Sequence, residues 1–151
     1  MYLTKSYHFF RWAGSKIWLV KYLDELLPDN FENYHEPFFG GGSMFLAINP
    51  KNKNYLSDIN TELINAYIKI RDDVDKLWSI IVKLKNNKDD YYRIRKSYSK
   101  QNDLEKAAMF IYLNRTSFNG IYRVNLKGKY NVPYGFKKYK TLFDHDKFTE
   151  L

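Results

Sequence analysis

"YHEPFFGGGSMFLAI", residues 34–48, places three consecutive glycines between a strand-like segment and an apolar run with helical spacing. A glycine-rich turn between a strand and a helix is typical of a nucleotide-binding βα unit, because bare backbone lets a ligand approach the start of the helix closely. A purely structural explanation is equally open, since glycines suit any strand–helix junction that needs positive φ. The stretch therefore predicts an α/β fold and leaves the ligand undecided.

The flanking sequence supplies the other elements of such a unit. Residues 16–27, "KIWLVKYLDELL", predict a helix that stops at Pro28, with "WAGS" as the turn before it. Downstream, a short strand ends at Leu56, and Asp58 precedes another helix. Asp58 lies about 20 residues past the glycines, where nucleotide-binding folds place an acid that receives ribose hydroxyls. An aspartate at this point is also a good helix N-cap, so both interpretations stay open.

Beyond Asp58 the sequence becomes mainly helical. Residues 61–85 predict one long helix or two, residues 89–100 another, and residues 103–118 a buried helix. Residues 119–135, "NGIYRVNLKGKYNVPYG", hold the turn dipeptides Asn-Gly and Lys-Gly between β-prone residues. This segment predicts a hairpin or an irregular loop.

Charge is spread unevenly along the chain. Residues 1–75 hold 8 Lys and Arg against 10 Asp and Glu, whereas residues 76–151 hold 17 against 7. Within residues 91–142 only Asp103 and Glu105 oppose 12 basic side chains. Such a block is typical of a protein that binds a polyanion, because each lysine or arginine near a phosphate releases condensed counterions. The alternative is a lysine-rich surface that reflects biased codon usage.

Length and composition exclude several classes of protein. The 151 residues, 44% of them hydrophobic, suffice for one ordinary domain. No apolar run approaches the ~20 residues of a membrane span, and the N-terminus lacks the apolar region of a signal peptide. The absence of cysteine excludes disulfides and thiolate metal sites. We expect a cytoplasmic protein without a metal site.

Four segments occur in the order, and at about the spacing, of the motifs of one enzyme family. They are "FRWAGSK" (10–16), "EPFFGGGS" (36–43), "YLSDIN" (55–60) and "YLNRTSFNGIYRVNLKGKYNVPYG" (112–135). They resemble motif X, motif I, motif II and the target-recognition region of the Dam-type DNA adenine-N6 methyltransferases of the D12 class, alpha group. The first segment is similar to the family's "KWAGGK", with Ser15 in place of Gly and with Arg11 keeping the basic charge before Trp12.

This resemblance implies that the first part of the chain binds S-adenosylmethionine. Trp12 and Lys16 would help to enclose the cofactor. Asp58 would take the ribose hydroxyls, a role that suits a carboxylate because it accepts hydrogen bonds from both O–H groups. On the methionine side of the cofactor the resemblance places Glu36, Pro37, Phe38, Gly40 and Gly42.

The same resemblance implies double-stranded DNA as a partner, with a GAT-containing recognition site. Arg123 falls where the family reads a guanine, and an arginine fork fits guanine O6 and N7 in the major groove. Asn119 and Ile121 lie on the loop that fills the space around an extruded adenine, since the target amine cannot reach the cofactor from inside the base stack. Arg11 is the fourth residue expected to contact DNA.

No catalytic residue is predicted within these 151 residues. The family activates the adenine amine with a [D/N/S]-P-P-[Y/F/W] motif, whereas the prolines here, Pro28, Pro37, Pro50 and Pro133, are never adjacent. We expect one subunit of a split enzyme, whose second polypeptide supplies the catalytic motif and the remaining sheet strands. A truncated, non-catalytic DNA-binding remnant is the alternative, and a basic RNA-binding module would leave the ordered motifs unexplained.

The expected fold is a partial Rossmann-like methyltransferase core with a mainly helical, basic target-recognition region. Residues 1–60 would form the partial core that binds S-adenosylmethionine. Residues 61–142 would form the recognition region with its basic hairpin, and residues 143–151 would begin the return to the core.

Overall fold

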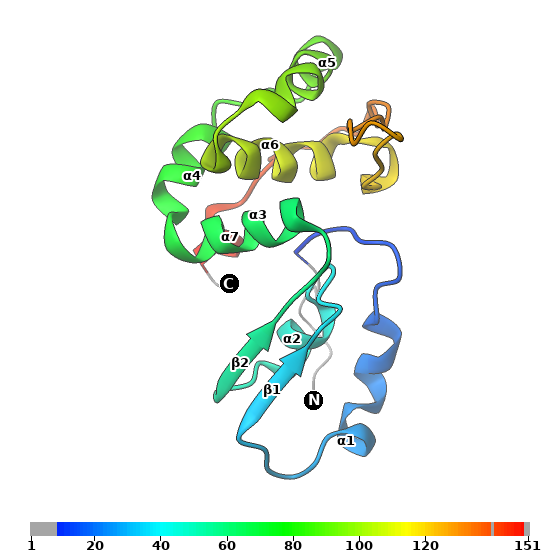
Figure 1. The fold of residues 1–151 in the computed structure, drawn as a ribbon, viewed down its shortest axis with the longest axis vertical. Helices are drawn as coiled ribbons and strands as arrows, with labels where there is room; N and C mark the ends of the chain where they lie inside the picture. Colours follow the sequence, from blue (N-terminus) through cyan, green and yellow to red (C-terminus); the bar gives the residue numbers. More distant parts are fainter. Residues whose placement is uncertain (1–8, 140, 150–151) are drawn as a thin grey trace. The chain divides into compact units, whose positions relative to one another are not determined.

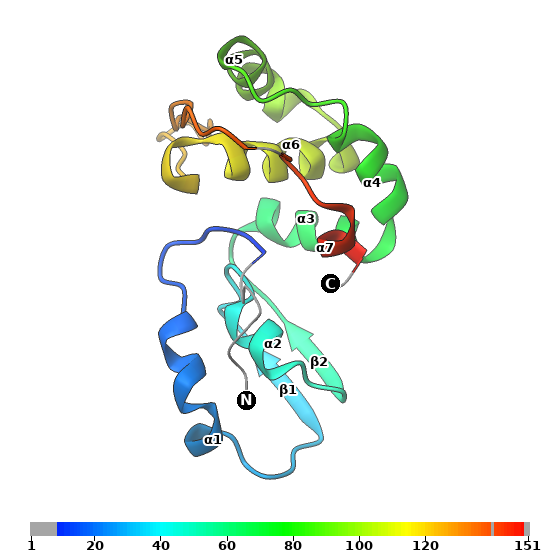
Figure 2. The same ribbon diagram turned by 180° about the vertical axis from the view of Figure 1, so that it is seen from behind.

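The computed structural model describes residues 9–139 and 141–149, and Figure 1 and Figure 2 show its ribbon from opposite sides. The chain forms two compact units, Met1–Ile59 (unit 1) and Asn60–Leu151 (unit 2). The described part of unit 1 contains two parallel strands, and that of unit 2 is mainly helical. The structure therefore mixes helices with a small parallel sheet, as expected of part of an α/β fold.

The sheet of unit 1 is built around the glycine-rich turn. Strands β1 (Asn33–Glu36) and β2 (Lys53–Leu56) pair in parallel, with Asn33 opposite Lys53 and Glu36 opposite Leu56. Parallel strands need a crossover connection, which here consists of the glycine turn and helix α2 (Ser43–Ile48). The Tyr34 ring contacts Phe45 of α2, with ring centroids 6.1 Å apart, so α2 packs on the Tyr34 side of the sheet. The predicted order of strand, turn, helix and strand is confirmed.

The helix predicted over residues 16–27 forms, but mostly with a tighter winding. Its first part is the 3-10 helix η1 (Ile17–Tyr22), and only Leu23–Leu26 is α-helical, as α1. No side chain caps the start of η1. Val20 and Leu23, the buried side chains that pack with Ala47 of α2, are three residues apart. A spacing of three residues puts both side chains on one face of the helical segment, which packs on α2 through them.

Unit 2 is organised around one buried helix. Its elements are α3 (Thr61–Asp72), α4 (Val74–Ile81), α5 (Lys88–Ser97), η2 (Tyr98–Lys100), α6 (Asp103–Thr116), η3 (Phe118–Gly120) and α7 (His145–Thr149). Helix α6 packs against α3, α4 and α5, and most of its last ten residues are buried. The prediction of a buried helix here is confirmed. Helix α7 packs on α4 through Phe148 and Trp78, whose ring centroids are 5.5 Å apart.

Three asparagines start the long helices of unit 2. The side chains of Asn60, Asn87 and Asn102 each accept a hydrogen bond from the backbone amide three residues later, at 3.0, 2.8 and 2.9 Å. This is the N-cap arrangement that satisfies an otherwise unpaired amide of the first turn. Residues 61–85 form two helices rather than one, because the chain leaves helical geometry at Asp73, which has φ −135°.

Two classes of feature are absent from the residues that the structure describes. None of their helices is long and apolar enough to cross a membrane. No group of three or more histidine, aspartate or glutamate side chains among them is arranged to hold a metal ion.

Candidate functional site

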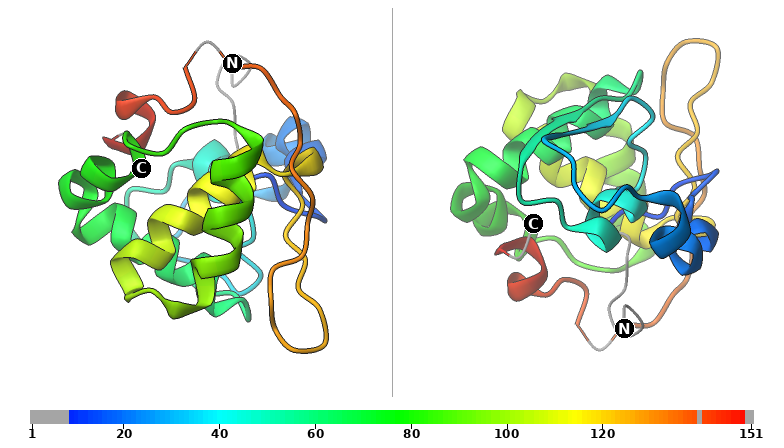
Figure 3. Two further views of the ribbon diagram at one scale, coloured as in Figure 1. Left: turned by 90° about the horizontal axis from the view of Figure 1, so that it is seen from above. Right: turned by 90° about the horizontal axis from the view of Figure 1, so that it is seen from below.

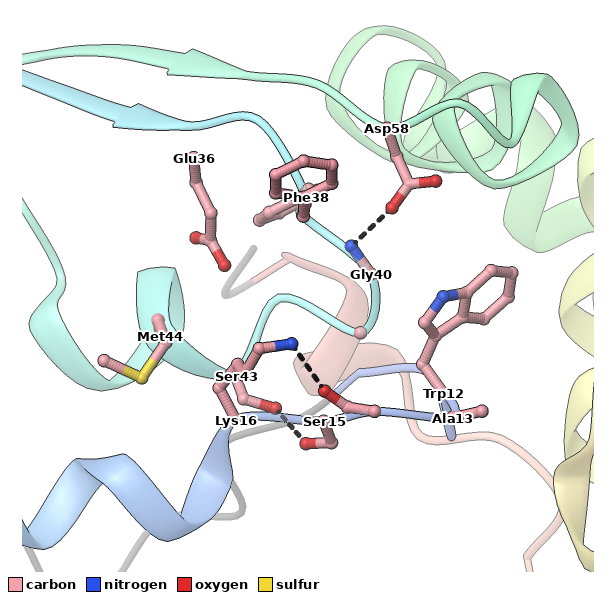
Figure 4. A pocket seen from close by; sticks show the side chains of 13 residues that line it. Trp12, Ala13, Ser15, Lys16, Glu36, Phe38, Gly40, Ser43, Met44 and Asp58 are labelled. Carbon is pink, nitrogen blue, oxygen red and sulfur yellow. Dashed lines mark hydrogen bonds between the residues drawn. The ribbon is translucent and has the colours of Figure 1, made fainter.

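Unit 1 contains a cavity of about 120 Å³ at the carboxyl ends of its two strands. Three segments of sequence form it: residues 12–16, residues 36–44 with the glycine turn, and Asp58 just after β2. Figure 4 shows these side chains converging on one space. The lining residues are Trp12, Ala13, Gly14, Ser15, Lys16, Glu36, Phe38, Phe39, Gly40, Gly41, Ser43, Met44 and Asp58.

The glycine turn lies directly against the segment that contains Trp12. A Cβ atom at Gly40 would lie 2.9 Å from Trp12 Cδ1, and one at Gly41 would lie 2.6 Å from the Phe10 carbonyl oxygen. Gly40 also has φ +53°, in the region that side chains disfavour. Close packing against residues 10–12 therefore explains why Gly40 and Gly41 are glycines. The same close approach brings Trp12 to the edge of the cavity.

Asp58 joins the end of β2 to the glycine turn. The Gly40 backbone N–H donates to Asp58 Oδ2 at 2.9 Å. The alternative in which Asp58 caps the following helix is wrong, because the side chain that caps α3 belongs to Asn60. The Asp58 carboxylate is instead held at the wall of the cavity by the backbone that it faces.

A second carboxylate, that of Glu36, lies at the end of β1. The Tyr34 hydroxyl donates to Glu36 Oε2 at 2.8 Å. Burial raises the pKa of Glu36 above its ordinary value, although this hydrogen bond and the positive charge of Lys16 oppose the rise. A partly desolvated carboxylate gains most from a cationic ligand, since a nearby positive charge favours its ionised form.

Lys16 and Ser15 close the cavity from the side of the N-terminal segment. The Lys16 ammonium donates to the Gly14 carbonyl at 2.8 Å. The Ser15 and Ser43 hydroxyls are hydrogen-bonded at 2.8 Å, which links this segment to the first residue of α2. Sequence reasoning treated Ser15 only as a departure from glycine, because nothing local indicates a partner 28 residues away.

The cavity gathers most of the residues expected at the cofactor. Those that line it are Trp12, Lys16, Glu36, Phe38, Gly40 and Asp58. Pro37 and Gly42 belong to the same turn but are not among the lining residues. Phe38 is 82% exposed at the edge of the cavity. Ser15, Ser43 and Met44 line it as well and were missed, since small and apolar residues carry no chemical signature in a sequence.

The residues expected at DNA lie in two places. Arg11 directly precedes Trp12 in unit 1, whereas Asn119, Ile121 and Arg123 share residues 117–136 of unit 2, here called the 117–136 loop. All three are exposed, and Asn119 adopts the left-handed region with φ +54°. Figure 3 shows the loop, in orange, as an extended segment beside α6. Phe118, which is 51% exposed next to Asn119, was missed by the sequence analysis.

The 117–136 loop is an irregular hairpin, whose arms are joined by backbone hydrogen bonds but form no regular strands. Isolated antiparallel bridges join Ser117 to Tyr134 and Val124 to Tyr130. A Cβ atom at Gly135 would lie 2.5 Å from the Ser117 carbonyl oxygen, so this glycine permits the closure of the loop base. The segment thus combines the two structures that the sequence left open: its arms pair as a hairpin does, but they form no regular strands.

Hydroxyl and guanidinium groups of unit 2 support the loop from its buried side. The Tyr91 hydroxyl and Arg95 Nη1 both donate to the Val132 carbonyl, each at 2.9 Å. The Tyr130 hydroxyl donates to the Ile121 carbonyl at 2.8 Å. Burial raises the pKa of Tyr130 to about 12, so its hydroxyl keeps the proton that it donates. These donors hold a segment that has little secondary structure of its own.

Comparison with known proteins identifies the family. The family model for D12 class N6 adenine-specific DNA methyltransferases matches residues 12–151. A type II methyltransferase of Lactococcus lactis subsp. cremoris is 35% identical over 145 residues, which cover 91% of this chain and 51% of the relative. A type II methyltransferase of Methanocaldococcus jannaschii is 36% identical over 157 residues, covering 90% and 54%.

The DNA adenine methylase of Escherichia coli K12 is 39% identical over 142 residues, covering 90% of this chain and 50% of the methylase. The chain therefore spans about half the length of these curated relatives.

Proposed function

We propose that this chain, which belongs to the D12 class N6 adenine-specific DNA methyltransferase family, binds S-adenosylmethionine in the cavity of unit 1 and reads a duplex site with the 117–136 loop. The observation that carries the proposal is the convergence of three distant segments on one cavity. They are the segments that the sequence assigns to the cofactor, and the hydrogen bond from Gly40 to Asp58 joins two of them directly.

The donor set of the cavity fits the chemical groups of the cofactor. S-adenosylmethionine carries a carboxylate, an ammonium, a sulfonium and a ribose diol. Lys16 complements the carboxylate and Glu36 the cationic groups. The Asp58 carboxylate suits the diol, because a carboxylate offers about four acceptor sites on its two oxygens.

The size of the cavity fits only part of the cofactor. Its volume of about 120 Å³ is below the ~300–1,000 Å³ of sites that enclose whole drug-sized ligands. The cofactor would therefore fill the cavity at one end and extend along its open edge, where Phe38 presents an exposed ring.

Within this proposal, the chain binds and orients the cofactor and reads the DNA sequence. The cofactor supplies an electrophilic methyl group when bound, and Lys16, Glu36 and Asp58 fix its orientation. The residues that activate the adenine amine are assigned to a polypeptide segment other than these 151 residues, such as the expected second chain, because no two prolines here are adjacent.

The proposal assigns DNA reading to Arg123 and its neighbours. A guanidinium reads guanine through O6 and N7 in the major groove, and Arg123 is exposed on the loop. Asn119, Ile121 and the exposed ring of Phe118 would occupy the space that an extruded adenine leaves, since base flipping opens a gap in the stack. A GAT-containing duplex is the first site to test.

Calorimetric titration with S-adenosylmethionine tests the cofactor half. Asp58→Ala should abolish measurable binding, because it removes the acceptor for the ribose hydroxyls and the partner of the Gly40 amide. Asp24→Ala is the matched control, since Asp24 is exposed on α1 and does not line the cavity. Unchanged affinity of Asp58→Ala would refute this half of the proposal.

Fluorescence anisotropy with duplex DNA tests the reading half. Arg123→Ala should relax the preference for guanine beside the target adenine by ~1–3 kcal/mol. Arg93→Ala is the control, because Arg93 is an exposed arginine of α5 that pairs with Asp90. An equal loss of affinity on every duplex would make Arg123 a phosphate contact and would contradict base reading.

A further inference from the structure

The guanidinium of Arg123 is already held by one side chain on the opposite arm of the hairpin. Arg123 Nε donates to Asn131 Oδ1 at 2.7 Å, and Arg123 Nη2 donates to the Asn131 carbonyl at 3.3 Å. The backbone N–H of Asn131 in turn donates to the backbone carbonyl of Arg123 at 3.1 Å. Three hydrogen bonds therefore join the two residues, and the neighbouring Val124–Tyr130 bridge keeps their strands together.

Asn131 stands on a fixed part of the loop. Its neighbours in the sequence, Tyr130 and Val132, are both buried. The Val132 carbonyl accepts from Tyr91 and from Arg95, which anchors the backbone next to Asn131 to α5. The acceptor that holds Arg123 is thus tied to the core of unit 2, whereas Arg123 itself is exposed.

The contact with Asn131 uses the edge of the guanidinium formed by Nε and Nη2, and it does not use the end formed by Nη1 and Nη2. Asn131 engages Nε and one proton of Nη2, so the two protons of Nη1 and the second proton of Nη2 point away from this pairing. A bidentate contact with guanine O6 and N7 needs one proton from each of two neighbouring nitrogens, which Nη1 and Nη2 supply. Because arginine has large rotamer entropy, holding it in this orientation before DNA arrives favours the base contact.

We infer that Asn131 is a positioning residue that orients Arg123 for guanine and so sets the sequence specificity of the 117–136 loop. This inference rests on the proposed function, since it needs Arg123 to read a base. Asn131 acts through Arg123, as an acceptor on Oδ1 and its carbonyl, and its own side-chain NH2 has no part in the reading.

A second asparagine of the same hairpin provides a matched control. Asn125 Oδ1 accepts from the Lys127 and Lys129 amides at 3.0 Å each, so this side chain shapes the tip of the loop. Asn125→Ala and Asn131→Ala remove the same atoms from the same hairpin. Only Asn131→Ala removes an acceptor from Arg123.

The test is fluorescence anisotropy with the full chain and three otherwise identical duplexes. One contains GAT, one has 2-aminopurine in place of its guanine and so lacks O6, and one has 7-deazaguanine and so lacks N7. The ratio of the dissociation constants, modified over unmodified, measures guanine reading. We expect a wild-type ratio of about tenfold, within the range of one bidentate contact, and Asn131→Ala should lower it at least about threefold toward unity.

Three further variants make the test specific. Asn125→Ala should keep the wild-type ratio. Asn131→Asp should also keep it, because the carboxylate retains the Oδ1 acceptor, while its added negative charge weakens binding to all three duplexes at low salt. In Arg123→Ala the ratio should be near unity, and adding Asn131→Ala should change it no further.

Each contrary outcome points to one failure. If Arg123→Ala abolishes the ratio and Asn131→Ala preserves it, the positioning role is wrong and the proposed function stands. If Asn131→Ala weakens all three duplexes equally, or if Asn131→Asp loses the ratio as Ala does, Asn131 contacts DNA directly and the inference is overturned. If the wild-type chain does not distinguish guanine from its analogues, base reading itself fails and the inference fails with it.

Discussion

The two units hold their candidate functional segments by different means. Unit 1, residues 1–59, has balanced charge, with 6 basic and 6 acidic residues, and a small core around Val20, Leu23 and Ala47. Unit 2, residues 60–151, has 19 basic and 11 acidic residues and a larger core that includes many tyrosines. In unit 1 the Asp58 carboxylate accepts from the glycine turn, whereas in unit 2 buried or partly buried hydroxyl and guanidinium groups donate to backbone carbonyls of the loop.

This difference follows from the ligands that we propose. A small cofactor is well held by glycines and carboxylates at the ends of strands, where the glycine backbone leaves room for it. A DNA duplex needs an exposed, basic segment that stays ordered in water, and buried hydroxyls such as that of Tyr91 provide the order. In both units one glycine allows close approach to a carbonyl: Gly41 to Phe10, and Gly135 to Ser117.

Replacing each of these two glycines by alanine should produce the largest effects, and each variant should lose the ligand of its own unit only. Gly135→Ala places a Cβ 2.5 Å from the Ser117 oxygen, so the loop base opens, at a cost of ~1–3 kcal/mol, and DNA binding is lost while cofactor binding remains. Gly41→Ala should have the reverse effect, because its Cβ meets the Phe10 carbonyl. Thermal unfolding and titration with each ligand measure both changes.

Gly128→Ala is the control for Gly135→Ala. Gly128 has φ +69°, but no described atom lies within 4 Å of a Cβ built there. Gly128→Ala therefore strains the backbone at the tip of the loop but creates no clash at its base, and it should retain DNA binding. Loss of both ligands in either Gly41→Ala or Gly135→Ala would show that the two sites are not separable in this way.

A smaller effect is expected from removing one support of the loop. Tyr91→Phe deletes the hydroxyl donor to the Val132 carbonyl and leaves Arg95 as its donor. We expect a loss of about 1 kcal/mol in the free energy of unfolding and weaker DNA binding, with cofactor binding unchanged. Tyr92→Phe is the control, because it keeps the ring that lies beneath Arg95. Equal behaviour of the two variants in denaturant titrations would contradict the supporting role.

The smallest effect that we expect is a pH dependence of the stability and cofactor affinity of unit 1. Because burial raises the pKa of Glu36, folded unit 1 holds a proton between the ordinary carboxyl pKa and the raised one, where the unfolded chain has released it. The free energy of unfolding therefore falls as pH rises through that window. Binding of the cationic cofactor favours ionised Glu36, so its affinity should fall as pH drops through the same window, with release of a proton on binding.

Calorimetry in two buffers of different ionisation enthalpy detects that proton. Glu36→Gln should bind more weakly and should release none. DNA binding by the 117–136 loop should not follow this pH dependence. Proton release that persists in Glu36→Gln would assign the titration to another group.

The sequence predicted those features that depend on neighbours in the chain. Glycines, apolar periodicity and turn dipeptides located the sheet, α2 and the hairpin because each acts over a few residues. It did not predict the 3-10 winding at Ile17–Tyr22, since the apolar spacing there fits an α-helix equally well. It also missed the bonds between Ser15 and Ser43 and between Arg123 and Asn131, since tertiary structure alone brings these side chains together.

The two roles of Asp58 show where sequence reasoning reaches its limit. Asp58 and Asn60 are both good N-cap residues two positions apart, and local preference does not distinguish them. The structure does, because Asn60 accepts from the helix and Asp58 accepts from the glycine turn.

Amide NMR of the isotope-labelled chain tests the central claim, two separate ligand sites, most directly. Titration with S-adenosylhomocysteine should shift the amides of residues 12–16, 36–44 and 58 and leave those of residues 117–136 in place. A GAT-containing duplex should shift the amides of residues 117–136, with Asn119, Ile121 and Arg123 among the largest changes. Shifts from the cofactor analogue that spare Gly40 and Asp58, or DNA shifts that spare the 117–136 loop, would contradict the account.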